Sequence, residues 1–164
     1  MPNIRQPNEL QSLTGVGPKV EQALNRLGLY SFRDLLFHLP ARYEDRTTQV
    51  DIASLKPGIP QLLEGEITSQ SVVPGRRMQA VLTFEDITGA ARIRLFHFSR
   101  AYLTTLKNAD SVRIFGEPRV NQGVTEFIHP EISVFKGEPP PLDDTLTPIY
   151  PTTDGLSQPK LRDI

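Results

Sequence analysis

Arginine or phenylalanine occupies every second position of one short segment of the chain, Ala91-Arg92-Ile93-Arg94-Leu95-Phe96-His97-Phe98. Side chains of a β-strand point alternately to its two faces, so a strand here places Arg92, Arg94, Phe96 and, if it extends that far, Phe98 on one face. Guanidinium groups bind phosphates, and aromatic rings offer flat surfaces on which any base can stack. The pattern therefore fits a surface for single-stranded nucleic acid. The alternative, which the residues alone slightly favour, is that the phenylalanines pack in the core and the arginines are only solvated.

Two more arginines, Arg76 and Arg77, lie in the turn expected between the first two strands of the same region. A loop at that place commonly binds ligands in small barrels of the OB-fold class. An arginine in a turn can equally serve solubility alone. Tyr102, Lys107 and Arg119 are further candidates for the same surface, on weaker grounds.

A glycine-rich turn near the start of the chain, Leu13-Thr14-Gly15-Val16-Gly17-Pro18-Lys19, resembles a helix-hairpin-helix motif. In such a turn the backbone N–H groups at a helix start approach a phosphate, and a nearby lysine adds positive charge. Gly15, Gly17 and Lys19 are therefore candidate phosphate contacts. Pro18 removes one N–H donor, and a purely structural turn is at least as good an explanation.

The chain has no pattern of residues typical of catalysis or metal binding. Phosphate-binding P-loops, nucleophile elbows and His-Glu-x-x-His pairs do not occur in the sequence, and there are no cysteines. Glu85 and Asp86 form a carboxylate pair at the end of a predicted strand, but neighbouring strand residues point to opposite faces, so the two would not cooperate as an acid and a base, and turn formation explains them better. The histidines His38, His97 and His129 lack the spacing of metal ligands. We expect no catalytic residues, no metal and no cofactor within these residues.

Charge is unevenly distributed, although the formal net charge is only −1. Eight basic and four acidic residues lie between Arg76 and Arg119, whereas four acidic and no basic residues lie between Gly137 and Gly155. Such segregation can conceal a phosphate-binding surface within a neutral total, although a solvated strand face explains it equally well. No apolar run is long enough to cross a membrane, and the N-terminus lacks a secretory signal.

The elements expected from the pattern are short. Residues 10–40 predict two helices: the first starts near Pro18 and ends at Gly28, and the second runs from a Ser31 cap to Pro40. Strands are predicted at 62–73, 77–85, 90–98, 111–120 and 124–129, with 131–135 as an extension of the last and a helix at 99–106. Five strands with a helix between the third and fourth are typical of an OB-fold barrel. We therefore predict a mainly β protein with a helical pair and connector at 1–60, the barrel at 61–136, and an acidic, proline-rich linker at 137–164.

Several stretches, in this order, resemble the N-terminal wedge domain of the RecG family of branched-DNA helicases. They are Leu13-Thr14-Gly15-Val16-Gly17, Asp34-Leu35-Leu36-Phe37-His38-Leu39-Pro40, Arg42-Tyr43-Glu44-Asp45-Arg46, Leu63-Glu64-Gly65-Glu66-Ile67, Gly75-Arg76-Arg77-Met78, Arg94-Leu95-Phe96-His97-Phe98-Ser99, Ile128-His129-Pro130-Glu131 and Leu146-Thr147-Pro148-Ile149-Tyr150-Pro151-Thr152-Thr153.

The resemblance implies a wedge that splits a DNA branch while motor domains beyond Ile164 use ATP and Mg²⁺ to translocate on the duplex. It implies that Phe96 and Phe98 stack on unpaired bases and that Arg92 and Arg94 contact phosphates, with either Tyr102 or Arg100 as a second stacking residue. The expected partner is forked or junction DNA, and a single-stranded-DNA-binding protein is a further expected partner of the full-length protein. The protein is expected to be a monomer in the bacterial cytoplasm, associated with the nucleoid. An OB-fold module for RNA or tRNA and a protein-interaction domain are the alternatives.

Overall fold

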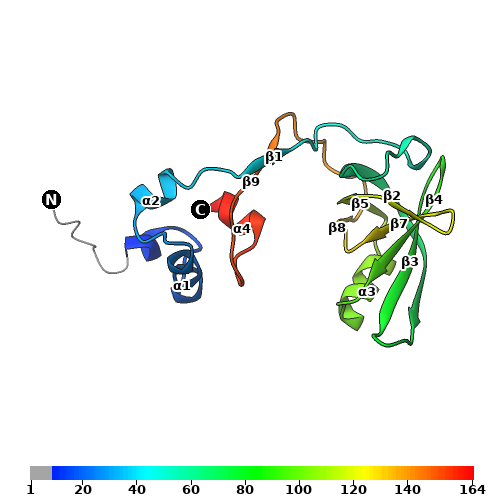
Figure 1. Ribbon diagram of the computed structural model, residues 1–164, viewed down its shortest axis with the longest axis horizontal. Coiled ribbons are helices and arrows are strands. Elements are labelled where there is room, and N and C mark those ends of the chain that lie inside the picture. The colour runs from blue at the N-terminus through cyan, green and yellow to red at the C-terminus, as the bar shows by residue number, and fades with distance from the viewer. Residues whose placement is uncertain (1–8) are drawn as a thin grey trace. The chain divides into compact units, whose positions relative to one another are not determined.

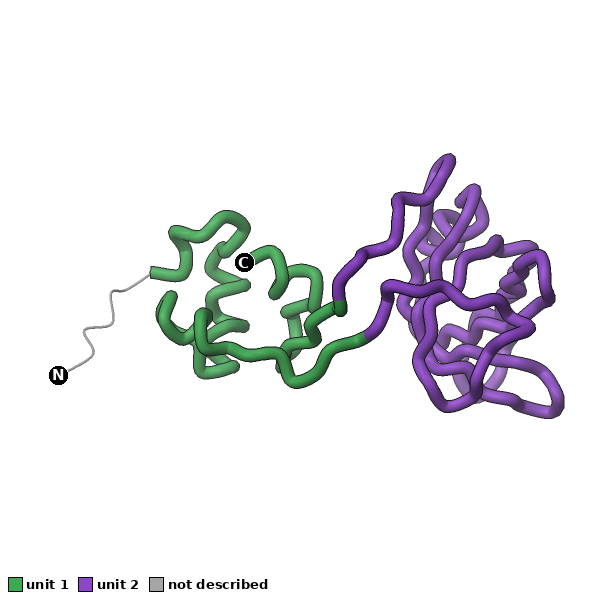
Figure 2. Tube along the Cα trace, turned by 90° about the horizontal axis from the view of Figure 1, so that it is seen from above, with its two compact units in different colours: residues 1–44, 146–164 green, residues 45–145 purple. Residues whose placement is uncertain are grey.

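The computed structural model describes residues 9–164, which form two compact units (Figure 2). Unit 1 contains the described residues up to Glu44 together with Leu146–Ile164, and unit 2 is Asp45–Thr145. The expected boundaries at 60/61 and 136/137 differ from this division, because residues 45–60 and 137–145 group with the barrel. The first eight residues of the expected region 1–60 lie outside the described residues.

Unit 1 contains the predicted pair of helices. A 3₁₀ helix, η1 (Glu9–Ser12), precedes α1 (Pro18–Arg26), which starts at Pro18 and is followed by Gly28 at a φ of 82°. Helix α2 (Phe32–Leu36) begins at Ser31, whose hydroxyl accepts a hydrogen bond from the Asp34 amide. It ends at Leu36, before the expected stop at Pro40, and Phe37 is its C-cap residue.

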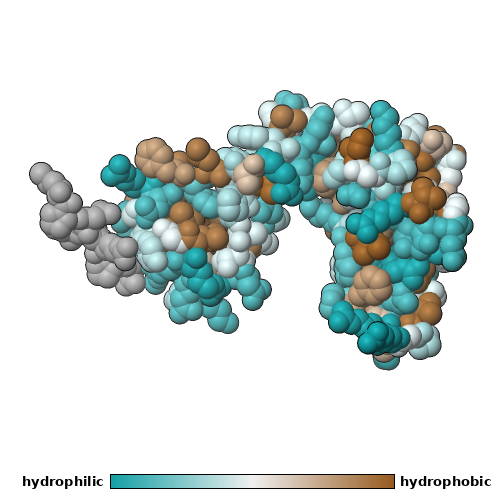
Figure 3. All heavy atoms as spheres, viewed as in Figure 1, coloured by the Kyte–Doolittle hydropathy of each residue, from teal (hydrophilic) through white to brown (hydrophobic). Residues whose placement is uncertain are grey.

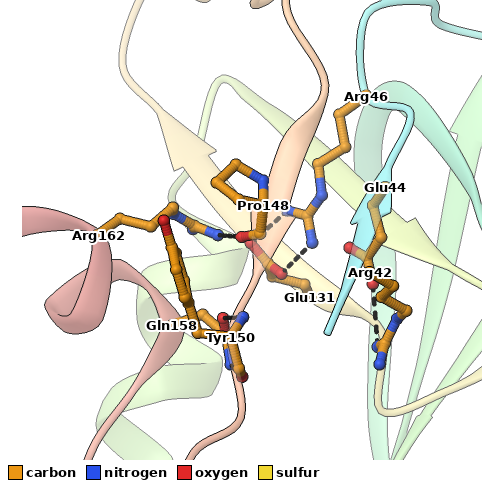
Figure 4. Close-up of polar contacts among 8 residues, drawn as sticks. All are labelled: Arg42, Glu44, Arg46, Glu131, Pro148, Tyr150, Gln158 and Arg162. Carbon is orange, nitrogen blue, oxygen red and sulfur yellow. Dashed lines mark hydrogen bonds and ion pairs between the residues drawn. The ribbon is translucent and has the colours of Figure 1, made fainter. Parts of the chain in front are cut away.

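The last part of the chain folds into unit 1 instead of forming the expected linker. Strand β9 (Thr147–Ile149) pairs antiparallel with β1 (Arg42–Glu44), and α4 (Gln158–Asp163) follows the Ser157 cap. The Gln158 side chain exchanges two hydrogen bonds with the backbone of Tyr150, at 2.9 and 2.7 Å (Figure 4). The apolar side chains that close this unit come from both ends of the chain: Leu10, Val16, Ala23, Leu24, Leu29 and Leu156.

Unit 2 is a β-barrel of the OB-fold class, as predicted (Figure 1). Its elements are η2 (Ile52–Ser54), β2 (Gln61–Val73), β3 (Gln79–Asp86), β4 (Gly89–Leu95), α3 (Arg100–Lys107), β5 (Ser111–Gly116), β6 (Arg119–Asn121), β7 (Val124–Ile128) and β8 (Glu131–Phe135). The strands follow the order β6-β7-β4-β3-β2-β5-β8. The long strand β2 pairs with β3 at one end and β5 at the other, and β4 pairs parallel with β7.

The strand assignments differ from the prediction at three places. The expected strand 111–120 is divided into β5 and β6, since the buried Pro118 cannot donate a ladder hydrogen bond. Strand β8 is not an extension of β7 but pairs with β5, because His129, at a φ of 46°, redirects the chain. Strand β4 ends at Leu95 and does not reach Phe98. The predicted hairpin at Asn121-Gln122-Gly123 is present, with positive φ at Gln122 and Gly123.

The barrel core is filled from alternate strand positions and by α3. Ala91, Ile93 and Leu95 face inward, as the alternation in β4 predicts. The other members of the core are Leu63, Ala80, Leu82, Phe84, Leu103, Leu106, Val112, Ile114 and Phe127. Gly65 lies where the pairing of β2 passes from β5 to β3, and a Cβ there would be 2.2 Å from the Glu85 carbonyl oxygen. Only glycine allows the two backbones to approach so closely.

Apolar side chains are also visible on the surface of both units (Figure 3). Exposed apolar residues of unit 1 are Leu36, Phe37 and Leu39, among others, and those of unit 2 include Val72, Val73 and Met78 at the β2–β3 turn. None of the helices within residues 9–164 has the length and apolar character needed to span a membrane.

Candidate nucleic-acid interface

Three chain segments meet in unit 2 to form an open groove, here called the branch groove. It is lined by Arg76 and Arg77 from the β2–β3 turn, Gln79 at the start of β3, Phe96 and His97 after β4, and His129 after β7. Arg76 and Arg77 are exposed. The groove thus brings together two of the predicted basic residues and one predicted stacking residue.

Phe96 is partly exposed and lies outside the barrel core. Its ring centroid is 5.8 Å from that of His129, at an interplanar angle of 40°. The Phe96 amide donates a hydrogen bond of 2.8 Å to His129 Nε2, and the His129 amide donates one of 3.0 Å to the carbonyl oxygen of Arg94. These two hydrogen bonds hold the backbone from Arg94 to the Phe96 amide against His129, and the Phe96 ring lines the groove.

Phe98 has a different environment. Because β4 ends at Leu95, the alternation that would place Phe98 beside Phe96 does not continue this far. The side chain of Phe98 is partly buried and packs against the barrel core, and it is not among the residues that line the branch groove.

Arg92 and Arg94 share the outer face of β4, as the strand pattern predicts, and both point toward the buried carboxylate of Glu126. Arg94 donates hydrogen bonds to Glu126 Oε2 at 2.8 Å and to Gln79 Oε1 at 2.5 Å, and its side chain is 22% exposed. Arg92 lies farther from Glu126, at 3.7 Å, and its side chain is 39% exposed. Of the two, Arg92 has the guanidinium group that is more accessible to a phosphate.

Tyr102 and Arg100 both lie in the first turn of α3, which begins after the Ser99 cap. Desolvation raises the pKa of the Tyr102 hydroxyl. Both residues are exposed, and neither lines the branch groove. Lys107, at the end of α3, and Arg119, in β6, also lie outside the groove.

The glycine-rich turn belongs to unit 1. Gly15 has a φ of 82°, and a Cβ there would be 2.4 Å from the Nζ of Lys160 in α4. Gly17 caps α1 without a side-chain hydrogen bond, and Lys19 is exposed in the first turn of the helix. The structure therefore adds Lys160 to the positive charge near this turn.

The sequence interpretation missed His129, His97, Gln79 and Glu126 as components of this surface. The register that places Glu126 opposite Arg92 comes from a parallel pairing between distant strands, and the local sequence contains no signal for it. His129 was visible only as part of the segment Ile128-His129-Pro130-Glu131 in the family resemblance. Within residues 9–164, no cluster of histidine and carboxylate side chains is arranged to hold a metal ion.

Comparisons with known proteins find the same family by sequence and by structure. The family model of the RecG wedge domain matches residues 9–164. The ATP-dependent DNA helicase RecG of Escherichia coli (strain K12) is 40% identical over 155 residues, which is 93% of this chain and 22% of that protein. The RecG helicase of Thermotoga maritima is 32% identical over 161 residues, or 95% of this chain and 20% of that protein.

A solved structure of RecG bound to a three-way DNA junction superposes with a TM-score of 0.77 and 27% identity, covering 94% of this chain and 21% of that one. The chain thus spans about a fifth of the length of the relatives it matches. From these matches and the barrel described above, we conclude that the chain belongs to the RecG wedge domain family.

Proposed function

We propose that this chain binds forked or junction DNA as the wedge of an ATP-dependent RecG-type helicase, and that the branch groove receives the first unpaired base. The observation that carries the proposal is the partly exposed Phe96 ring, which lies in one groove with Arg76 and Arg77. Stacking on an aromatic ring is worth roughly 1–3 kcal/mol per base and does not depend on which base it is. Guanidinium groups add attraction for phosphates that is equally independent of sequence.

The expected selectivity is for DNA structure and not for base sequence. A base can stack on Phe96 only where it is not already stacked within a duplex, so a fork offers the groove a ligand that a blunt duplex does not. Arg92 and the β2–β3 turn contact the phosphates on either side. Tyr102 or Arg100 in α3, and Gly15, Gly17 and Lys19 in unit 1, are proposed as additional contacts with the same DNA.

In this proposal the wedge itself catalyses no reaction. The motor activity, with its ATP and Mg²⁺, belongs to domains outside residues 1–164, as the helicase activity of the relatives suggests. We further propose that the whole protein acts on stalled forks and Holliday junctions as a monomer in the bacterial cytoplasm, near the nucleoid, where a single-stranded-DNA-binding protein is its partner.

Fluorescence anisotropy with labelled fork, blunt duplex and single-stranded oligonucleotides tests the proposal. We expect the chain to bind the fork most tightly, with an affinity that falls as salt rises. Replacing Arg76 and Arg77 by alanine should reduce the slope of log affinity against log salt by about 1.8, or about 0.9 per phosphate contact. Lys56→Ala is a suitable control, because Lys56 is exposed in unit 2 but does not line the groove.

Two outcomes would favour the alternatives. Tighter binding of an RNA competitor than of the fork would indicate an RNA module. Absence of any nucleic-acid binding at low salt would indicate a protein-interaction domain and would contradict the proposal.

A further inference from the structure

His129 occupies an unusual backbone position beside the proposed stacking residue. Its φ of 46° lies in the left-handed region, which residues other than glycine rarely adopt. Two hydrogen bonds link it to the segment after β4: the His129 amide donates to the Arg94 carbonyl oxygen, and the Phe96 amide donates to His129 Nε2. The first bond fixes the backbone of His129, and the second uses its side chain to hold the backbone of Phe96.

The direction of the second bond determines the state of the imidazole. A backbone amide can only donate, so Nε2 must carry the lone pair, and the proton of the neutral ring must be on Nδ1. The same ring faces Phe96 and has its centroid 5.6 Å from that of His97. The imidazole of His129 therefore makes two contacts with Phe96: it accepts a hydrogen bond from the Phe96 amide, and it lies against the Phe96 ring.

The backbone of His129 is itself well anchored. On one side, Ile128 ends the parallel pairing of β7 with β4, opposite Arg94. On the other, Pro130 packs so closely on Gly116 that a Cβ at Gly116 would lie 3.0 Å from it. Glu131 follows and accepts two hydrogen bonds of 2.8 Å from Arg46 (Figure 4). The imidazole thus projects from a rigid support, whereas Phe96 lies beyond the end of its strand.

We propose that His129 is a positioning residue for DNA binding: its neutral imidazole holds Phe96 in the conformation that stacks on an unpaired base. This inference rests on the proposed function of the branch groove. Without the acceptor at Nε2, no ladder hydrogen bond holds the Phe96 amide, because β4 has already ended at Leu95. The Phe96 ring must then be ordered when the DNA binds, and the entropic cost of that ordering lowers the affinity.

Two substitutions separate the acceptor from the backbone conformation. The variant His129→Gly adopts the positive φ readily, and its backbone amide can still donate a hydrogen bond to the Arg94 carbonyl oxygen, but it lacks the imidazole. His129→Gln restores an acceptor, Oε1, at about the reach of Nε2, and Gln122 shows that glutamine adopts a φ of 50° in this chain. Phe96→Ala is measured alongside them, and thermal melting checks that each variant is folded.

The assay is binding to a fork with 2-aminopurine at the first unpaired position, since stacking on an aromatic ring changes the fluorescence of this base. We expect His129→Gly to bind the fork at least fivefold more weakly, with loss of the fluorescence change, and His129→Gln to recover to within about threefold of wild type. Equal binding by wild type and His129→Gly, or a glutamine variant as weak as the glycine variant, would overturn the positioning role, provided that Phe96→Ala is weakened. If Phe96→Ala also binds like wild type, the proposed function itself fails.

Discussion

Arg92 and Arg94 lie two residues apart on the same face of β4, yet the structure predicts that replacing each by alanine affects a different property of the protein. Both guanidinium groups point toward Glu126, whose side chain is only 5% exposed. Arg94 makes the shorter ion pair, at 2.8 Å, and also binds Gln79, whereas Arg92 is 3.7 Å from the carboxylate and more exposed. Arg94 should therefore matter mainly for stability, and Arg92 mainly for DNA.

The size of the stability effect follows from burial. Breaking a fully buried ion pair costs about 3–5 kcal/mol, and breaking an exposed pair costs about 0–1 kcal/mol. Since Arg94 is 22% exposed and Arg92 remains near Glu126 after its removal, we expect Arg94→Ala to lower the free energy of unfolding by about 2 kcal/mol. For a domain of this size that lowers Tm by roughly 8–16 °C. Arg92→Ala should cost about 0.5 kcal/mol.

Two measurements on the same variants test this division. Thermal melting by circular dichroism gives the change in Tm, and fork binding at several salt concentrations shows how many phosphates each variant no longer neutralises. Arg92→Ala should reduce the slope of log affinity against log salt by about 0.9, and Arg94→Ala should reduce it less. The double variant Arg94→Ala, Glu126→Gln should regain part of the lost stability, because the uncompensated buried carboxylate is gone. A larger fall in Tm for Arg92→Ala than for Arg94→Ala would refute the reasoning.

Three other outcomes follow from the barrel. Gly65→Ala should destabilise unit 2 by about 3 kcal/mol, because the new Cβ would lie 2.2 Å from the Glu85 carbonyl oxygen. Gly75→Ala is the control, since a Cβ there would have its nearest neighbour at 3.4 Å. Equal Tm values for the two variants would contradict the close approach at Gly65. Asp86 is partly desolvated, which opposes ionisation, but hydrogen bonds from Thr88, Ile52 and Gly89 outweigh this and lower its pKa. A lowered folded pKa means that the stabilisation is present above the unfolded pKa of about 3.9 and is lost as pH falls through the folded value. Asp86→Asn should therefore lower the urea midpoint at pH 7 and lose less stability than wild type between pH 5 and pH 2, and parallel acid profiles would argue against it. Phe98→Ala should lower Tm, since its side chain packs on the barrel core, and a Tm unchanged from wild type would show that this packing contributes little.

Much of the fold was accessible from local sequence. The strand alternation identified Ala91, Ile93 and Leu95 as core, and Asn121-Gln122-Gly123 identified a hairpin. These features depend on neighbouring residues alone. The end of β4 was missed because the residues after Leu95 continue the alternation, and nothing local shows that the segment turns to reach His129.

The candidate site was harder to predict because it depends on contacts distant in sequence. The residue types were clear, since guanidinium groups and rings on one strand indicate nucleic acid. The sequence did not show which of these residues face a ligand, because the pairing of Arg94 with Glu126 and the packing of Phe98 against the core both come from the tertiary fold. The folding of residues 146–164 onto the N-terminal helices was missed for the same reason: their apolar residues are sparse and follow a proline-rich segment typical of a linker.

The most direct test of the central claim compares Phe96→Ala with wild type on two DNA ligands, a fork and a blunt duplex of the same sequence. If an unpaired base stacks on Phe96, the variant should bind the fork roughly 5- to 150-fold more weakly, which corresponds to about 1–3 kcal/mol, and should bind the duplex as wild type does. Equal fork affinity for the two proteins, both fully folded, would show that the ring does not receive the base.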